Sequence, residues 1–282
     1  MATADEVRSQ QRETWDRFSD GWTKWDDLVL TMIEPVGAEM IRSLDLREDA
    51  EHLDVAAGTG EPGLTIAALV PRGRVVVTDL AAGMLTTARA RAAARGLDNV
   101  EVRECSVDDL PFDDASFDSI TCRFGFMFFP DLVAAIDELV RVLRPGGKIA
   151  AAVWAEPPGN AWATIPMGAI AAQVDLPRPD PDAPGLFRFA APDAIGSAFR
   201  AAGMRDVAET DVTATLDPES LEEYWAFMTE IAAPVVGALS TVDDATRERI
   251  RVATLEQARA FVIDGRPRLP LHARCIVGTK AG

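Results

Sequence analysis

Short hydrophobic runs alternate with amphipathic stretches through the middle third of the chain. The runs predict strands at 51–57, 74–78, 100–105, 117–122 and 148–154, and the stretches between them predict helices at 64–70, 84–95 and 132–143. Strands that alternate with helices at this spacing are typical of βαβ crossovers, in which helices cover both faces of a parallel sheet. The pattern therefore predicts a doubly wound, mostly parallel α/β sheet.

The segments on either side of this alternation are mainly helical in pattern. A helix-like stretch with four large aromatic residues covers 5–30, and a second one follows at about 31–45. Towards the C-terminus the pattern predicts helices at 194–202, 219–239 and 243–262, and strands at 206–216 and 272–279. The chain thus divides into a helical N-terminal part, residues 1–45, a core, residues 46–155, and a C-terminal part, residues 156–282.

Residues 156–192 interrupt the pattern with many prolines, at positions 157, 158, 166, 177, 179, 181, 184 and 192. So many prolines predict that no regular element forms there, because proline removes a backbone donor and clashes inside a helix. Large apolar residues in the same segment require burial, and these are Trp162, Ile165, Met167, Ile170, Phe187 and Phe189. The segment is predicted to be a wrapping loop or lid packed on the molecule.

The net charge of the chain limits the classes of partner that it can bind. Of its 282 residues, 45 are Asp or Glu and 28 are Lys or Arg, which gives a net charge of −17. Such an acidic surface repels phosphate backbones and anionic lipid, so neither nucleic acid nor a membrane is expected as a partner. No apolar run approaches the roughly 20 residues that span a bilayer, and the first residues do not resemble a signal peptide.

The three cysteines and the basic residues bear on the cellular setting. Cys105, Cys122 and Cys275 are widely separated and lie in apolar segments, which predicts buried reduced thiols in a cytoplasmic protein. Lysine is rare beside arginine, and alanine is abundant, which favours a GC-rich bacterial source. The oligomeric state is left open, with a homodimer among the arrangements that the sequence allows.

A glycine-rich turn follows the first predicted strand. Gly58, Gly60 and Gly63 match the G-x-G-x-x-G pattern, in which a missing side chain lets the backbone approach a ligand. Asp79 ends the second predicted strand, where a carboxylate can accept two hydrogen bonds from a ribose diol. Both features fit a nucleoside ligand, and they serve a nicotinamide dinucleotide and S-adenosylmethionine (SAM) alike.

Further motifs separate these two cofactors. Asp54 lies inside the first strand, Asp108-Asp109-Leu110-Pro111-Phe112 follows the third, Phe117-Asp118 opens the fourth, and Leu143-Arg144-Pro145-Gly146-Gly147 precedes the fifth. In this order and spacing, residues 50–155 resemble the class I SAM-dependent methyltransferases, in the branch of the ubiquinone/menaquinone biosynthesis C-methyltransferases. The resemblance implies a seven-stranded sheet with an antiparallel last strand at 272–279. It also implies that the cofactor lies across the carboxyl ends of the strands.

The resemblance assigns most of the cofactor site. Asp79 is expected to bind the ribose hydroxyls, whereas Asp54 acts on the SAM ammonium directly, acts through water, or orders the loop. Residues expected to contact SAM through their backbone are Ala56, Gly58 and Gly60. Leu80 and Met84 are expected to pack on the adenine, although Met84 also fits an ordinary core position.

Two positions depart from the family pattern or remain ambiguous. Relatives often carry Gly-Asp-Ala after the third strand, with the Asp accepting from the adenine amino group, but here the run is Cys105-Ser106-Val107. Ser106 or Asp108 is then expected to accept that bond, with the backbone of Val107 also available. Arg123, at the end of the fourth strand, is expected either to pair with the SAM carboxylate or to pair with surface acids.

The acceptor side is expected to be apolar. Aromatic residues at helical spacing are as often core as ligand contacts, but the run 124–129 follows the strand that delivers the acceptor-side loop in this fold. The expected walls of the acceptor pocket are Trp15, Phe18, Trp22, Trp25, Phe124, Phe126, Met127, Trp154, Phe187 and Arg188, the last facing an acidic group of the acceptor. They predict a small hydrophobic or aromatic acceptor of secondary metabolism, and leave open whether carbon, oxygen or nitrogen is methylated.

Few residues are available as a general base. His52 precedes the first strand at the end away from the site and is interpreted as structural, while His272 begins the last strand and is a weak candidate for a base. No Ser/His/Asp set or metal-ligand cluster is apparent. The sequence thus predicts a SAM-dependent methyltransferase, with residues 1–45 as an N-terminal lid, 46–155 as the SAM-binding core and 156–282 as the acceptor side. The alternatives are a nicotinamide-dependent oxidoreductase and a SAM-fold protein without methyl transfer, either a pericyclase-like catalyst or a binding module.

Overall fold

A computed structural model describes residues 3–175 and 183–282. Seven strands form one sheet in the order β3-β2-β1-β4-β5-β9-β6. Their bounds are β1 (Glu51–Val55), β2 (Arg74–Asp79), β3 (Val100–Glu104), β4 (Phe117–Arg123), β5 (Leu143–Trp154), β6 (Met204–Leu216) and β9 (Leu269–Lys280). Strands β1 to β5 run parallel, and β9 lies antiparallel between β5 and β6. The predicted mostly parallel sheet with an antiparallel last strand is confirmed.

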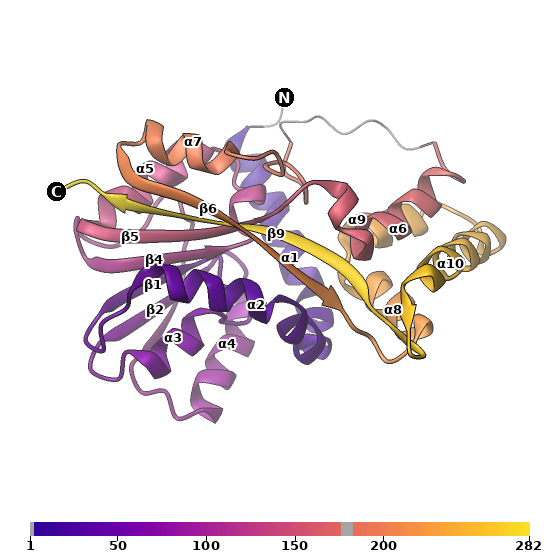
Figure 1. The fold of residues 1–282 in the computed structure, drawn as a ribbon, viewed down its shortest axis with the longest axis horizontal. Coiled ribbons are helices and arrows are strands. Elements are labelled where there is room, and N and C mark those ends of the chain that lie inside the picture. Colours follow the sequence, from indigo (N-terminus) through magenta and orange to yellow (C-terminus); the bar gives the residue numbers. More distant parts are fainter. Residues whose placement is uncertain (1–2, 176–182) are drawn as a thin grey trace.

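Helices cover both faces of this sheet (Figure 1). The helices of the core region are α2 (Asp26–Leu44), α3 (Gly63–Leu69), α4 (Ala82–Ala94), α5 (Leu132–Val142) and α7 (Ala194–Ala201). Cys275 of β9 contacts Val36 of α2, whereas Gly278 lies against Phe199 of α7. Because odd and even residues of a strand point to opposite faces, α2 and α7 lie on opposite sides of the sheet.

Burial on both faces explains the continuous apolar runs that predicted the strands. Val75, Val76 and Val77 of β2 are fully buried, as expected for a central strand of a covered parallel sheet. Helix α2 presents a stripe at helical spacing to the sheet. Its buried residues are Val29, Met32, Ile33, Val36, Gly37, Met40 and Leu44.

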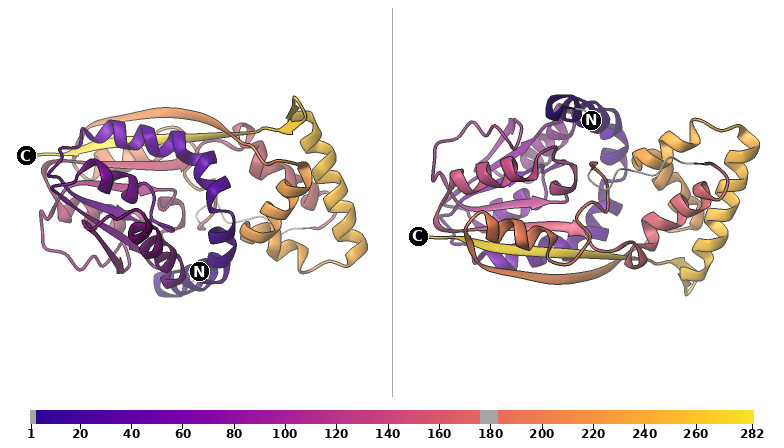
Figure 2. Two further views of the ribbon diagram at one scale, coloured as in Figure 1. Left: turned by 90° about the horizontal axis from the view of Figure 1, so that it is seen from below. Right: turned by 90° about the horizontal axis from the view of Figure 1, so that it is seen from above.

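A helical cap extends the molecule beyond the carboxyl ends of the strands. It consists of α6 (Ala161–Ala171), α8 (Leu221–Ile231), α9 (Ala233–Leu239) and α10 (Asp244–Ala258). The long strands β6 and β9 leave the sheet and reach these helices, as both views of Figure 2 show. A two-stranded hairpin, β7 (Val262–Ile263) with β8 (Arg266–Pro267), follows α10.

Helix α1 (Ala4–Lys24) differs from every helix that packs on the sheet. None of its residues is buried. It contacts α4 of the core and α8 of the cap. In Figure 1 it crosses at the carboxyl ends of the strands, between the sheet and the helical cap. Within the N-terminal part, α1 therefore lies at the carboxyl edge of the sheet without a buried residue, whereas α2 belongs to the packed core.

The prediction that the proline-rich segment contains no regular element is wrong at one place. Helix α6 spans Ala161–Ala171 with Pro166 inside it. Pro166 has no N–H for the carbonyl of Trp162, one turn earlier. The hydroxyl of Tyr224 donates to that carbonyl instead, at 2.7 Å. The cap therefore replaces the missing hydrogen bond from outside the helix. Pro177, Pro179 and Pro181 lie outside the described residues.

Several predicted boundaries are also corrected. The first predicted helix, 5–30, ends at Lys24, and α2 starts after a break at Trp25. The predicted helix 219–239 is two helices, because the chain turns at Ala232 before Pro234, the second residue of α9. Strand β5 begins at Leu143 and includes the Pro-Gly-Gly turn that was expected to precede it. In the described part of the chain, no helix has the length and apolarity to cross a membrane.

Candidate functional site

The turn between β1 and α3 contains three glycines, two required by close packing and one that borders open space. A Cβ added at Gly63 would lie 2.8 Å from an Asp54 oxygen, and one at Gly60 would lie 2.9 Å from Leu64, so packing requires both glycines. Gly58 has φ +55°, and a Cβ there would meet nothing within 4 Å. The backbone at Gly58 thus borders open space, where a ligand can approach it.

Asp79 lies directly beside this turn, at the carboxyl end of β2. Its carboxylate accepts the N–H of Gly58 at 2.8 Å and the N–H of Ala81 at 2.9 Å. Burial raises the pKa of Asp79, and the backbone donors partly oppose that effect. Each carboxylate oxygen keeps a further lone pair, so Asp79 can order the turn and accept ligand hydroxyls together. Nearby, Leu80 is half-buried and Met84 is buried.

Asp54 is fully buried and has partners on both oxygens. The hydroxyl of Thr121 donates to one oxygen and the N–H of Gly63 to the other, each at 2.7 Å. Burial raises the pKa of Asp54 to about 7. These contacts are those of a residue that orders the turn and fixes the start of α3, which was one of the three roles expected for it.

His52 belongs to the same buried network. Its ring contacts the hydroxyls of Ser119, at 2.8 Å, and Thr121, at 2.9 Å. Burial lowers its pKa to about 3, so the ring is neutral. When Asp54 is ionised, Thr121 gives its proton to the carboxylate, so Nε2 of His52 donates to Thr121 and Nδ1 accepts from Ser119. The structural role expected for His52 agrees with these contacts.

Arg123 lies at the end of β4 on the face covered by α2. A Cβ added at Gly37 would lie 3.5 Å from its guanidinium, so α2 closely covers the group. Burial lowers its pKa, and the nearby charges of Asp54 and Glu61 oppose the shift. Within residues 3–175 and 183–282 it forms no ion pair, so pairing with surface acids, one of the two expectations, is not what the structure contains.

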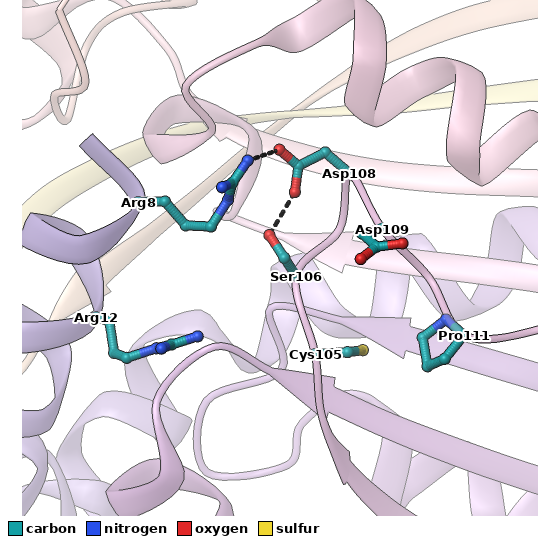
Figure 3. Close-up of a pocket in the computed structure, with 7 residues that line it drawn as sticks. All are labelled: Arg8, Arg12, Cys105, Ser106, Asp108, Asp109 and Pro111. Carbon is teal, nitrogen blue, oxygen red and sulfur yellow. Dashed lines mark hydrogen bonds and ion pairs between the residues drawn. The ribbon is translucent and has the colours of Figure 1, made fainter. Parts of the chain in front are cut away.

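The exit of β3 forms one wall of a pocket of about 490 Å³. Ser106 donates to Asp108 at 2.5 Å, and Arg8 of α1 pairs with the other oxygen of Asp108 (Figure 3). The lining residues are Arg8, Arg12, Cys105, Ser106, Asp108, Asp109 and Pro111. Val107, also expected near adenine, is buried. Both oxygens of Asp108 thus already have protein partners. The sequence did not predict the pairing with Arg8, because Arg8 is 100 residues away along the chain.

The arginines of α1 were missed in the sequence. The only signal was their spacing, since Arg8 and Arg12 are one helical turn apart and so share a face. Nothing local indicates that this face meets the β3 exit. The burial of Asp108 would raise its pKa, but hydrogen bonds from Ser106 and Arg8 outweigh that effect and lower it.

Aromatic side chains form two clusters at the carboxyl edge. In the first, Trp15 of α1 lies 5.9 Å from Trp22 and 5.2 Å from Phe128, measured between ring centroids. In the second, Phe124 stacks on Trp154 at 4.1 Å, and Trp154 lies 5.0 Å from Trp162 of α6. The lid, the β4 exit, the end of β5 and the cap therefore all contribute rings.

Other residues expected in the acceptor pocket have different surroundings. Phe126 and Met127 are fully buried, and Phe126 packs on Phe199 of α7, so both are core residues. Trp25 packs on Phe227 and donates its indole N–H to Glu230, which anchors the break between α1 and α2. Phe18 and Phe187 are half-buried.

Arg188, expected on the acceptor side, and His272, the candidate base, contact neighbouring segments. Arg188 donates to the carbonyl of Phe129 and lies over the ring of Phe189. His272 is half-buried on β9, with Nε2 3.4 Å from Asp211. Its backbone N–H donates to Asn160, in the loop before α6. These contacts support the position of both side chains without bringing them to Asp79.

Known proteins resemble this chain over the region just described. A family profile described as a methyltransferase domain matches residues 53–147. A demethylmenaquinone methyltransferase of Thermus thermophilus is 36% identical over 52% of this chain and 69% of its own length. A nocamycin O-methyltransferase of Saccharothrix syringae is 34% identical over 66% of this chain and 70% of its own. Several other relatives match over only 44% of their own length.

Solved structures agree on the fold. The YcgJ protein of Bacillus subtilis superposes with a TM-score of 0.56 and 22% identity, covering 87% of this chain and 98% of that protein. The chain belongs to the class I SAM-dependent methyltransferases. Within that class it lies in the branch of the ubiquinone/menaquinone C-methyltransferases, and its cofactor is SAM. The nicotinamide alternative left open by the glycine pattern is thereby set aside.

Proposed function

We propose that this methyltransferase binds SAM along the turn between β1 and α3 and transfers the methyl group to a small hydrophobic, aromatic acceptor. The observation that carries the proposal is the gathering of aromatic rings at the carboxyl edge of the sheet, the same edge at which the turn after β1 lies. The acidic chain, with its net charge of −17, disfavours anionic polymers as acceptors.

The residues around the turn fit this cofactor. Asp79 would accept the ribose hydroxyls, and the backbone at Ala56, Gly58 and Gly60 would border the methionine part. Arg123, a covered cation without a carboxylate partner among the described residues, would pair with the methionine carboxylate through favourable electrostatics. Ser106 and Val107 would border the adenine, with Leu80 and Met84 on its other side.

The chain contributes position and shelter rather than acid–base chemistry. SAM supplies a methyl group already activated by the positive charge on its sulfur. Holding an acceptor against that methyl group accounts for most of the acceleration that the protein can provide. Flat rings such as Phe124 and Trp15 would hold an aromatic acceptor by stacking. Helix α1, placed across the carboxyl ends, would exclude water from the reacting groups.

Two relatives are named for small-molecule acceptors. One is named for demethylmenaquinone and the other for nocamycin. The acceptor of this chain is inferred from its aromatic clusters, and the names only narrow which compounds to test first.

A panel of acceptors tests the proposal. The protein is incubated with radiolabelled SAM and with hydroquinones, naphthols, phenols, sugars and amino acids, and labelled products are identified by mass spectrometry. Transfer is expected to the aromatic compounds, and Trp15→Leu should raise the acceptor KM several-fold without changing S-adenosylhomocysteine (SAH) binding. Phe18→Leu, on the same helix but outside both clusters, is the matched control. Transfer confined to the sugars or amino acids would contradict the proposed acceptor class.

A further inference from the structure

Helix α1 is attached to the rest of the molecule through polar side chains and through two half-buried rings, Trp15 against Phe128 and Trp22 against the core. None of its residues is buried. Its contacts pair Arg8 with Asp108, Asp16 with the N–H of Gly83, Thr23 with Thr87, and Lys24 with Glu230. Exposed polar contacts of this kind contribute little individually. The helix can therefore detach without disrupting the core.

One of these contacts lies far from the hinge. The break at Trp25 joins α1 to α2, and Lys24 and Trp25 are both bound to Glu230 there. Arg8 lies 17 residues before this break, about 25 Å along the helix at the usual rise per residue. A contact at that distance controls the swing of the helix far more than one at the hinge.

The ion pair between Arg8 and Asp108 is partly buried, and neighbouring residues hold both side chains in place. The Arg8 side chain is 27% exposed and that of Asp108 11%. The guanidinium of Arg8 also donates to Asp5. Ser106 donates to the second oxygen of Asp108 (Figure 3). Both side chains are thus oriented by neighbours, which reduces the entropy lost in pairing them.

The pair closes a specific part of the cofactor site. Ser106, which holds Asp108, occupies the position where relatives place the carboxylate that binds adenine. Arg8 and Asp108 line the same pocket as Ser106. On the cofactor placement proposed above, this pocket borders the adenine end, so the inference below rests on that placement.

We propose that Arg8 and Asp108 form a latch that holds α1 closed over the adenine end and sets the rate at which SAM enters and SAH leaves. Nε of Arg8 is buried without a hydrogen-bond partner in the described part of the chain. An unsatisfied buried donor opposes closure. The latch is therefore weak enough to open in each catalytic cycle.

Stopped-flow binding of SAH to the full-length protein tests the latch. SAH carries no net charge, so the acidic surface does not steer its approach. Arg8→Ala and Asp108→Asn should each raise the association and dissociation rates together by about fivefold, and the double variant should add nothing further. The dissociation constant should change less than the rates, because a gate acts on both directions. Salt should accelerate the wild type and have little effect on the variants.

Arg17→Ala is the matched control, since Arg17 is an exposed arginine of the same helix that does not line this pocket and has no ion pair among the described residues. Unchanged rates in Arg8→Ala would overturn the latch, as would equal acceleration in Arg17→Ala. A weaker affinity of Asp108→Asn at an unchanged association rate would make Asp108 a direct adenine contact instead. Asp79→Ala separates this inference from the proposed function. If Asp79→Ala binds SAH with wild-type affinity, the proposed placement of the cofactor is wrong. If Asp79→Ala binds SAH more weakly but Arg8→Ala keeps the wild-type rates, only the latch is wrong.

Discussion

At the scale of single residues, His52 and Asp54 are two buried titratable groups on one strand that share Thr121 as a partner. Burial lowers the pKa of His52 to about 3 and raises the pKa of Asp54 to about 7. Unfolded values are about 6.5 for His and 3.9 for Asp. Between about pH 4 and 6.5, His52 is protonated in the unfolded state and neutral in the folded state. In the same range Asp54 is ionised in the unfolded state and protonated in the folded state.

The contributions of the two groups to the free energy of unfolding should therefore change in opposite directions with pH. In that window the contribution of His52 to the free energy of unfolding rises with pH, and that of Asp54 falls, each by about 1.4 kcal/mol per pH unit. Relative to the wild type, His52→Gln should lose stability as pH rises from 4 to 6.5, and Asp54→Asn should gain it. Urea unfolding across this range measures both. Parallel pH profiles for the wild type and both variants would show that the groups are not buried as described.

The glycines of the turn give a second prediction at this scale. Gly58→Ala should remain folded, with a loss of about 1 kcal/mol for the left-handed backbone, and should weaken SAH binding at least tenfold because the methyl group enters the open space. Gly63→Ala should instead destabilise the fold by more than about 2 kcal/mol, since its methyl group would overlap Asp54. Urea unfolding and calorimetric titration separate the two effects. Wild-type SAH affinity in Gly58→Ala would show that the cofactor does not approach the backbone at Gly58.

At the scale of elements, helix α6 depends on a hydrogen bond supplied by α8. Tyr224→Phe leaves the Trp162 carbonyl without a donor, which should cost about 1–3 kcal/mol in the free energy of unfolding. Pro166→Ala restores a backbone N–H for the same carbonyl, so Tyr224→Phe should cost clearly less in that background. Urea unfolding of the four proteins measures the coupling. Equal costs in both backgrounds would show that the hydroxyl does not replace the missing bond.

Helix α1 can be tested by removal. Deleting residues 1–24 takes away a helix without a buried residue and keeps α2, whose apolar stripe is part of the core. The truncated protein should therefore keep its sheet, as judged by circular dichroism, and lose methyl transfer by orders of magnitude because the site is open to water. Deleting residues 1 and 2, which keeps Asp5, Arg8 and the Thr3–Glu6 capping box of α1, is the control. A truncated protein that transfers methyl at the full rate would rule out α1 as a lid.

Across the whole molecule, what the sequence predicted follows from local physics. The strands and the helices of the core were predictable because each is buried on a defined face, which leaves runs such as Val75–Val77 or a stripe such as that of α2. The turn at Gly58 and the carboxylate of Asp79 were predictable because their chemistry is local to two strand ends.

The remaining features depend on contacts between distant segments. Helix α6 was missed because the donor that compensates for Pro166 lies 62 residues away along the chain, on α8. The sequence suggested an N-terminal lid, but the occupation of Asp108 by Arg8 depends on a contact across 100 residues that no local pattern indicates. Phe126 and Met127 resembled acceptor contacts in sequence, but both are fully buried, and Phe126 packs on Phe199 of α7.

The account as a whole depends on Asp79 as the residue that binds the ribose of the cofactor. Calorimetric titration of SAH into the wild type, Asp79→Ala and Asp98→Ala tests this most directly, since Asp98 is an exposed acid just before β3, away from the pocket lining, and controls for the change in charge. The account predicts that Asp79→Ala weakens binding by about 1.5–3 kcal/mol, roughly 10- to 150-fold, and that Asp98→Ala stays close to the wild type. Wild-type affinity in Asp79→Ala would contradict it.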